Sequence, residues 1–294
     1  MLAIDPKTEA TGAYSNWKNA TQDALRACGA EVAKSLSAGD KAEEIQIAKL
    51  KSTAHSHSLK ISVSDQKGFL KIFSNSELGR AAYERERASL CLLKDSGLVP
   101  LIRSYSDARH WVITEWIDVS AETYPVAFGS PVAFAYELGQ WLARFDGIAP
   151  AQPATGNWLT YLRKLGDTLD LGRNPGAAET LSAIPLCGRA LSRNDPALPN
   201  YLFASDGRVL GCDFEKAQLR PRGWDFIQGF GALIERFPEQ VEDVLEAYAK
   251  GFATTHKGVL LVNELCAIAR IYVCARISAL GAPSEFELES IGWQ

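Results

Sequence analysis

Cysteine pairs and histidine clusters are missing from this sequence, although it contains six cysteines and four histidines. None of the cysteines forms a C-x-x-C pair, which is the spacing that zinc sites and redox motifs use. His55 and His57 alternate within a polar stretch, which is more typical of a solvated loop than of a metal site. We therefore expect neither a zinc site nor a disulfide framework, and we interpret the cysteines as small buried hydrophobic residues.

An excess of basic residues and a long apolar run are also missing. The formal net charge is −4 and the isoelectric point is near 5.7, so the chain lacks the basic field that nucleic acid requires. The first six residues do not combine a basic segment with an apolar core, so we expect no signal peptide. The most apolar late stretch, 258–280, is interrupted by Asn263, Glu264, Arg270 and Arg276, which favours a buried helix over a membrane span. We expect a cytoplasmic protein.

The composition and patterning that are present indicate a soluble protein with two kinds of structure. Hydrophobic residues make up 47% and charged residues 22% of the 294 residues, as in globular proteins. Helical spacing predicts a helix within the first forty residues. Alternation then predicts strands over 45–50, 59–63, 69–73 and 111–117. A helix is expected between the last two, over 77–93.

Beyond residue 118 the pattern is mainly helical. Helices are expected over 132–145, 175–184 and 240–280. One hairpin interrupts them, with strands over 200–204 and 208–213 and a turn at Asp206-Gly207. We therefore predict an α+β, protein-kinase-like fold with a small β-rich lobe over 1–117 and a larger, mainly helical lobe over 118–294.

Two residues of the β-rich lobe suit the binding of phosphate. Lys71 lies within the apolar strand Phe69-Leu70-Lys71-Ile72-Phe73, where it is either an edge charge or a ligand of phosphate. Glu86 follows on the expected helix and would hold that lysine, although Glu84 is a rival and a solvated helix face is the simpler interpretation. Phosphoryl transfer needs such a cation, because negative charge must be neutralised.

The second lobe carries the more specific pattern. Asp195 and Asn200 stand five residues apart on a proline-rich loop that leads into the hairpin, and Asp213 ends the second strand of that hairpin. This order brings a carboxylate, an amide and a second carboxylate together. Oxygen ligands of this kind suit magnesium, and a further carboxylate can accept a hydroxyl proton.

These segments resemble the aminoglycoside phosphotransferase/choline kinase family. The stretch from Leu186 to Phe203, with Asp195-Pro-Ala-Leu-Pro-Asn200, is similar to the family's catalytic loop, which reads His-Gly-Asp, four residues, Asn and then an apolar strand. Cys212-Asp-Phe-Glu-Lys-Ala217 resembles its Ile-Asp-Phe-Glu-x-Ala segment. Arg222-Gly-Trp-Asp-Phe226 resembles the segment that follows, and Thr114-Glu-Trp-Ile117 resembles the hinge at the adenine. The resemblance covers roughly residues 40–290 and is moderately specific.

The resemblance implies a role for each matched residue. Asp195 would be the catalytic carboxylate, and Asp225 would brace the catalytic loop. The cofactors would be ATP and Mg²⁺, with magnesium held by Asn200 and Asp213. The nucleotide would be held by Lys71, Glu86 and the hinge backbone at Glu115, Trp116 and Ile117, with hydroxyls such as those of Ser56 and Ser58 facing the phosphates.

The chain departs from the family at several positions. Arg193 and Asn194 replace the histidine and glycine of the catalytic loop, and Ala197 stands where many members carry a basic residue or histidine. No glycine-rich loop is present between the first two strands, so hydroxyls and backbone amides would have to bind phosphate. A nucleotide-binding pseudokinase or regulatory binding module on the same fold therefore stays an alternative.

The acceptor is expected to be a small molecule. Asp213-Phe214 is followed by Glu215 rather than glycine, and no Ala-Pro-Glu follows it, which argues against a protein kinase. A hydroxyl of an aminoglycoside, an amino alcohol or a sugar-like molecule fits equally well. Trp158, Tyr161 and Trp224 are candidate walls of the acceptor pocket, although aromatic residues in helices more often belong to the core.

Overall fold

The computed structural model describes seven stretches of the chain: 45–63, 65–118, 129–148, 152–165, 176–204, 206–256 and 261–279. The helix expected within the first forty residues lies outside them. The chain forms two compact units. Unit 1 comprises Met1–Ala121, Ala204–Asp206 and Leu210–Glu215, and unit 2 comprises Glu122–Phe203, Gly207–Val209 and Lys216–Gln294.

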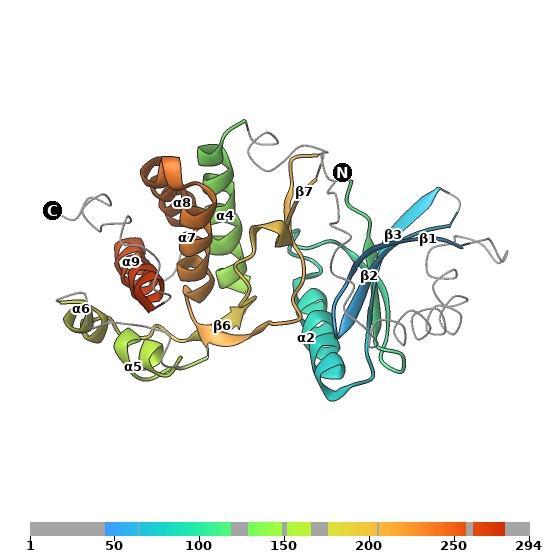
Figure 1. Cartoon of the computed structure of the whole chain (residues 1–294), viewed down its shortest axis with the longest axis horizontal. Coiled ribbons are helices and arrows are strands. Elements are labelled where there is room, and N and C mark those ends of the chain that lie inside the picture. Colours follow the sequence, from blue (N-terminus) through green and yellow to red (C-terminus); the bar gives the residue numbers. More distant parts are fainter. Residues whose placement is uncertain are drawn as a thin grey trace. The chain divides into compact units, whose positions relative to one another are not determined.

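Unit 1 is built on a five-stranded antiparallel sheet with the order β1-β2-β3-β5-β4 (Figure 1). Its strands are β1 (Ile45–Ser52), β2 (Ser56–Val63), β3 (Gln66–Phe73), β4 (Ile102–Ser106) and β5 (Trp111–Glu115). The sequence predicted every strand except β4. That strand lies at the edge of the sheet and none of its residues is fully buried, so no apolar alternation marks it.

The two faces of this sheet differ in chemistry. Leu59 pairs with Leu70 across β2 and β3, and the next pair along is Ser58 with Lys71. Because successive side chains point to opposite faces, the two pairs lie on different faces. The leucine pair belongs to a buried apolar cluster with Ile61, Val63, Ile72, Trp111 and Ile113. Lys71 therefore lies on the face opposite this apolar cluster.

Helix α2 (Glu77–Leu93) has the bounds that the sequence predicted. Ser76 caps its first turn by accepting a hydrogen bond from the Gly79 amide at 3.1 Å, which satisfies a donor that the helix itself cannot. The buried positions recur every three or four residues and include Tyr83, Glu86 and Leu90. One glutamate thus lies on the buried face of the helix, while Glu84 is exposed.

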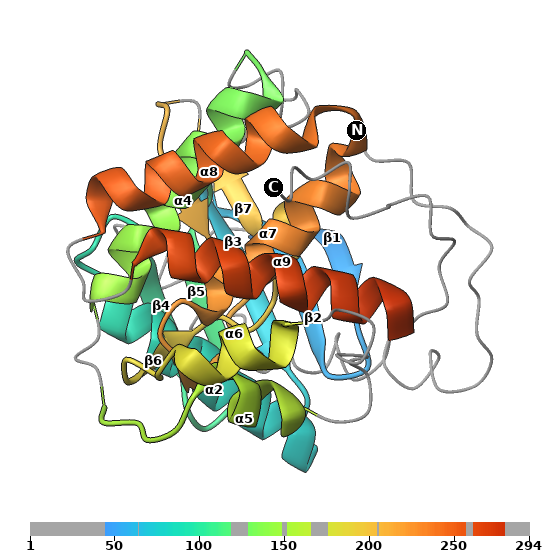
Figure 2. The same cartoon turned by 90° about the vertical axis from the view of Figure 1, so that its left-hand side faces the viewer.

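The described part of unit 2 is mainly helical (Figure 2). Helix α4 (Pro131–Ile148) lies alongside α8 (Val241–Thr255). Two glycines allow their backbones to meet: a Cβ at Gly251 would lie 2.0 Å from the Tyr136 carbonyl oxygen, and one at Gly139 would lie 2.2 Å from that of Tyr248. The remaining helices are α5 (Trp158–Arg163), α6 (Ala177–Ala183), α7 (Trp224–Arg236) and α9 (Val262–Ala279).

Short strands and turns link these helices. β6 (Arg189–Ser192) pairs with β9 (Gln218–Pro221), and β7 (Tyr201–Phe203) with β8 (Val209–Gly211). The 3₁₀ turns are η2 (Leu198–Asn200) and η3 (Pro238–Gln240). The stretch 240–280, for which helix was expected, holds two helices: α8 ends at Thr255 and α9 begins at Val262.

Several elements of unit 2 were missed. No prediction was made for the helices α5 and α7, nor for the strands β6 and β9, which are four residues long and carry mixed side chains.

Among the residues that the structure describes, none of the helices is both long enough and apolar enough to cross a membrane.

Candidate active site

Lys71 is buried among three carboxylates in unit 1. Its side chain is 4% exposed, and its Nζ lies 2.5 Å from Asp213 Oδ1, 3.1 Å from Glu215 Oε2 and 3.5 Å from Glu86 Oε2. β3 supplies the lysine and α2 supplies Glu86, while the two remaining carboxylates follow β8 in the sequence. One buried ammonium is thus shared by three carboxyl groups.

The charges of this cluster do not balance. Burial opposes the charged form of Lys71, but the nearby carboxylates outweigh it and raise the pKa of the lysine, so the lysine carries its proton at neutral pH. Burial also raises the pKa of Glu86 to about 7, although Lys71 acts in the opposite direction. Lys71 neutralises only one of its three neighbours. The cluster therefore keeps a surplus of carboxyl groups over cations.

The segment that carries Asp213 and Glu215 is held to the rest of unit 1 by its backbone. The Gly211 amide donates to the Leu98 carbonyl at 2.8 Å, and Arg85 of α2 donates through Nε to the Glu215 carbonyl at 2.6 Å. Asp213 itself has a φ of +64°, a left-handed conformation that aspartate tolerates better than most side chains. This turn directs its carboxylate to Lys71.

The connection between β1 and β2 is closed by hydroxyl groups rather than by glycine. Thr53 Oγ1 accepts from the amides of His55 at 3.2 Å and Ser56 at 3.0 Å. The Ser56 hydroxyl is buried and donates to Glu215 Oε2 at 3.4 Å. Ser58 is half-buried beside Lys71 in the sheet register. Both serines that the sequence singled out therefore lie close to the Lys71 cluster.

The expected hinge follows β5. The Glu115 amide donates to the Leu101 carbonyl at 2.8 Å, and its carboxylate accepts from the Leu101 amide at 3.0 Å. Trp116 lies outside the strand, with the Lys60 ammonium 4.6 Å from its ring centroid, and Ile117 is buried. The Glu115 amide and carboxylate thus both bond Leu101, and the Glu115 carbonyl accepts from Thr114 Oγ1 at 3.3 Å.

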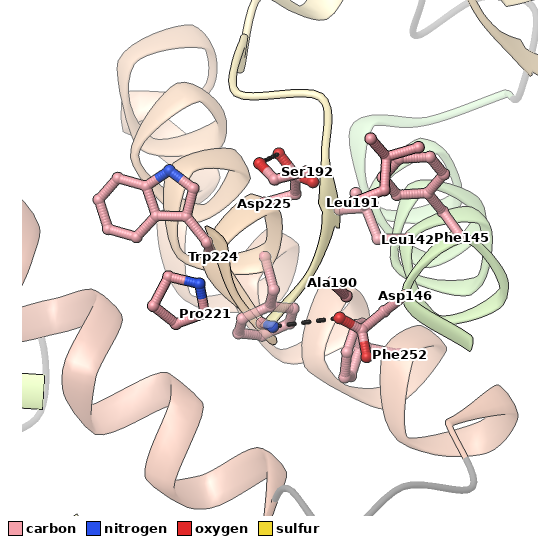
Figure 3. A pocket seen from close by; sticks show the side chains of 12 residues that line it. Leu142, Phe145, Asp146, Ala190, Leu191, Ser192, Pro221, Trp224, Asp225 and Phe252 are labelled. Atoms are coloured by element: carbon pink, nitrogen blue, oxygen red, sulfur yellow. Dashed lines mark hydrogen bonds between the residues drawn. The ribbon is translucent and has the colours of Figure 1, made fainter. Parts of the chain in front are cut away.

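In unit 2, Asp225 organises the loop that precedes Asp195. Its carboxylate accepts from Ser192 Oγ at 2.9 Å and from the amides of Arg193 and Asn194 at 3.0 Å each. Burial raises the pKa of Asp225, and the Arg193 guanidinium with these hydrogen bonds opposes that rise. Figure 3 shows the bond between Ser192 and Asp225. Asp225, at the start of α7, therefore fixes the backbone just before Asp195.

The buried Arg193 side chain bonds the backbone of the loop from Asp195 to Asn200. Its side chain is 1% exposed, and its two terminal nitrogens donate to the carbonyls of Asp195 at 2.5 Å and Asn200 at 3.0 Å. Its guanidinium carbon also lies 4.0 Å from the ring centroid of Tyr201. The arginine that replaces the family histidine thus bonds backbone carbonyls at both ends of the Asp195–Asn200 loop.

The backbone conformation of Asn194 accounts for an asparagine where the similar motif has glycine. Its φ is +55°, a conformation that glycine adopts freely and that asparagine tolerates. Its side-chain oxygen accepts from Trp224 Nε1 at 3.2 Å and from Arg220 Nε at 3.3 Å. Asparagine therefore keeps the backbone turn that a glycine would allow and adds two bonds to it.

Asp195 has a partner for each carboxylate oxygen. Oδ1 accepts from the Ala197 amide at 3.2 Å, and Oδ2 lies 2.9 Å from Lys216 Nζ. Asn200 closes the loop by donating its amide to the Ala197 carbonyl at 3.0 Å. The structure thus gathers Asp195, Arg193 and Asn200 in unit 2, and it gathers Lys71, Glu86 and Asp213 in unit 1.

Sequence reasoning missed two members of these clusters. Glu215 and Lys216 were quoted within the Asp-Phe-Glu motif, but neither received a role. The first pairs with Lys71 and the second with Asp195. A charged dipeptide directly after a strand-end aspartate was the available signal.

A small cavity lies beneath the loop, but its polar side chains already have partners. Asp146 of α4 accepts from Arg222 Nε at 3.0 Å and from the Gly223 amide at 3.2 Å. The cavity is lined by parts of α4, β6, β9, α7 and α8. Asp146 therefore ties α4 to the start of α7.

The aromatic residues considered as acceptor walls are core residues. Trp158, Tyr161 and Trp224 are buried. Their rings form an edge-to-face series with centroids 5.8 Å and 5.4 Å apart, which Tyr272 of α9 continues at 5.3 Å. This is the arrangement that aromatic side chains prefer inside proteins.

Comparison with known proteins was made for sequence and for structure. No protein-family model matches the chain, and none of the curated proteins does. Solved structures match: a choline/ethanolamine kinase family protein from Mesorhizobium loti has a TM-score of 0.53 at 18% identity, over 89% of this chain and 96% of that chain. A choline kinase from Cryptosporidium parvum gives 0.54 at 12%, over 89% and 88%.

A third structure extends this group. A Ralstonia eutropha protein, provisionally described as an aminoglycoside phosphotransferase, has a TM-score of 0.52 at 15% identity, over 92% of this chain and 93% of that chain. The resemblance that the motifs indicated is thus confirmed at the level of the fold. This chain has the fold of the choline kinase and aminoglycoside phosphotransferase structures, with a small antiparallel-sheet lobe and a helical lobe.

Proposed function

We propose that this protein is an ATP-dependent phosphotransferase that moves a γ-phosphoryl group to a hydroxyl of a small molecule such as an aminoglycoside, an amino alcohol or a sugar-like compound. The observation that carries the proposal is the buried Lys71, held by Glu86 on the sheet face opposite the apolar cluster. A stability role alone explains this cluster poorly, because burying Lys71 and Glu86 beside two half-buried carboxylates opposes folding.

The proposed nucleotide site uses the residues of unit 1. Lys71 would exchange part of its contact with Asp213 and Glu215 for phosphate oxygens, while Glu86 keeps the ammonium in place. The residual negative charge of the cluster suits a hard cation. Asp213 and Asn200 offer a carboxylate and an amide oxygen, which fit Mg²⁺ with water completing its shell. When bound, the ion would neutralise charge on the phosphates.

The proposed chemistry uses Asp195. The acceptor hydroxyl oxygen bonds to the γ-phosphorus as the bond from that phosphorus to the ADP oxygen breaks. ADP leaves with the electron pair of the broken bond, and the hydroxyl proton passes to Asp195. Arg193 cannot take this proton because a guanidinium stays charged in proteins. It acts instead through the loop carbonyls that it holds.

The alternative is a nucleotide-binding pseudokinase or regulatory module on the same fold. The β1–β2 connection favours it, because Thr53 engages two backbone amides that a phosphate would otherwise use. The conformation of the Asp195 loop favours catalysis, since both departures from the family pattern preserve that loop. The two proposals differ in whether Asp195 is needed for turnover.

The test compares the parent protein with Asp195→Asn. Calorimetry with magnesium and ATP measures affinity, and release of phosphate from ATP measures turnover, alone and with panels of sugars, amino alcohols and aminoglycosides. We expect equal affinity and a loss of roughly 10²–10⁴-fold in turnover, as for removal of a general base. Asp243→Asn, an exposed change on α8, is the matched control. Equal turnover in the parent and Asp195→Asn supports the pseudokinase, and a parent that binds no nucleotide overturns both nucleotide-binding proposals.

A further inference from the structure

The loop after Asp195 has no cation of its own in this chain. Residue 197 is alanine, and its only polar contribution to Asp195 is the backbone amide that donates to Oδ1 at 3.2 Å. A carboxylate that faces an incoming phosphoryl group repels it. Phosphoryl transfer therefore needs positive charge near the carboxylate, aimed at the equatorial oxygens where charge accumulates.

The structure places a lysine from elsewhere at this carboxylate. Lys216 Nζ lies 2.9 Å from Asp195 Oδ2, and Lys216 follows the Asp213-Phe214-Glu215 segment rather than belonging to the catalytic loop. The nearby arginines are committed differently: Arg193 donates to two carbonyls, and Arg220 donates to Asn194. Among the described residues around this loop, Lys216 forms the ion pair with the Asp195 carboxylate.

The burial of the two partners shows that this pair is not mainly a stabilising contact. The Lys216 side chain is 58% exposed and that of Asp195 is 13% exposed. A pair that water reaches this easily contributes about 0–1 kcal/mol to stability. The ion pair therefore positions the Lys216 ammonium, and breaking the pair costs little free energy.

The chemistry of lysine suits a moving phosphoryl group. Its ammonium is a compact charge on a flexible four-carbon stem. An ammonium has three N–H donors, so one bond to Asp195 is compatible with another to a phosphate oxygen. A modest rotation of the stem redirects the charge from the carboxylate to the transferring group.

We propose that Lys216 is a catalytic residue whose ammonium stabilises the negative charge of the transferring phosphoryl group, in place of the cation that position 197 lacks. This assignment rests on the proposed function. Because the charge it opposes develops during transfer, Lys216 should contribute more to the transition state than to the binding of ATP.

The experiment measures binding of ATP and binding of a mimic of the transition state. Calorimetry measures two affinities: that for magnesium with ATP, and that for magnesium with ADP and fluoroaluminate. Fluoroaluminate mimics the transferring phosphoryl group. The proteins compared are the parent, Lys216→Met, Lys216→Arg and Lys250→Met. Lys250 is an exposed lysine on α8 and serves as the control. Turnover is followed by release of inorganic phosphate from ATP, and melting temperatures check the fold.

We expect Lys216→Met to lower turnover by roughly 10²–10³-fold, as for the loss of one charge-stabilising donor. Its affinity for ADP with fluoroaluminate should fall at least tenfold relative to its affinity for ATP. Lys216→Arg should retain part of the turnover and part of the affinity for ADP with fluoroaluminate. Lys250→Met should match the parent in both.

Two results overturn the assignment in distinguishable ways. If the parent binds both ligands and Lys216→Met equals or exceeds it in turnover and in fluoroaluminate affinity, Lys216 is not catalytic and the proposed function stands. If the parent binds neither ligand and releases no phosphate, the proposed function fails and the assignment fails with it.

Discussion

Replacing Arg193 by methionine should test whether a buried guanidinium maintains the catalytic loop. Methionine has a similar length and fills the same space, but it donates no hydrogen bond. The change removes the bonds to the carbonyls of Asp195 and Asn200 and the contact with the Tyr201 ring. It also removes the positive charge that opposes the raised pKa of Asp225.

The structure sets the expected size of the effect. Each bond from a charged donor contributes about 1.5–3 kcal/mol, and removing one partner from a buried ionic network costs roughly 3–5 kcal/mol. These figures describe overlapping contributions, so we expect the free energy of unfolding to fall by about 3–5 kcal/mol. Displacement of Asp195 should also lower turnover by roughly 10²-fold, because reacting groups tolerate little misplacement.

The assay combines denaturation in urea, followed by tryptophan fluorescence, with release of phosphate from ATP. Arg193→Lys is the informative companion, because it keeps the charge but lacks the planar fork that reaches two carbonyls. We expect its stability and turnover to lie between those of the parent and Arg193→Met. If Arg193→Met unfolds at the parent's urea concentration and retains the parent's turnover, the guanidinium does not organise the loop and our reasoning is wrong.

Three further predictions concern other parts of the molecule. Asp213→Ala should abolish magnesium-dependent nucleotide binding in calorimetry while the fold persists, with Asp213→Asn as the variant that retains the tolerance for positive φ; unchanged affinity in the alanine variant would refute the metal role. Because burial raises the pKa of Glu86 from 4.5 to about 7, the folded protein retains a proton that the unfolded chain loses. The free energy of unfolding should therefore fall as pH rises from about 4.5 to 7, and Glu86→Gln should reduce that slope in urea titrations unless another group causes it. Gly251→Ala should lower the melting temperature, corresponding to about 1–3 kcal/mol, because its Cβ would lie 2.0 Å from the Tyr136 carbonyl; Gly147→Ala, with open space around it, should not.

Local patterns in the sequence were sufficient to predict much of the fold. Alternating apolar residues predicted β2, β3 and β5, and helical spacing predicted α2 over its full length. These elements follow from the sequence because each buries one regular face. β4, β6 and β9 could not be found in this way, since they are short and obtain their hydrogen bonds from partners distant in the sequence.

The sequence also proposed the residues of the candidate site, because their order along the chain resembles a known motif, and the structure brings Lys71, Glu86 and Asp213 together. It did not decide between Glu84 and Glu86. Both stand on α2, and only the packing of that helix buries Glu86 next to Lys71 and leaves Glu84 exposed. The choice depends on which side of the helix meets the sheet, which is a tertiary property.

The same holds for two of the departures from the family pattern. Arg193 and Asn194 differ from the residues of the family motif. In the structure, Arg193 bonds the loop carbonyls and Asn194 adopts a backbone conformation typical of glycine. The roles of Glu215 and Lys216 were likewise decided only by folding. The sequence by itself determined the elements that bury one regular face, such as β2, β3 and α2, and the residue types that they carry. Tertiary structure decided which charges meet, because ion pairs such as Lys71 with Glu215 join residues far apart in the chain.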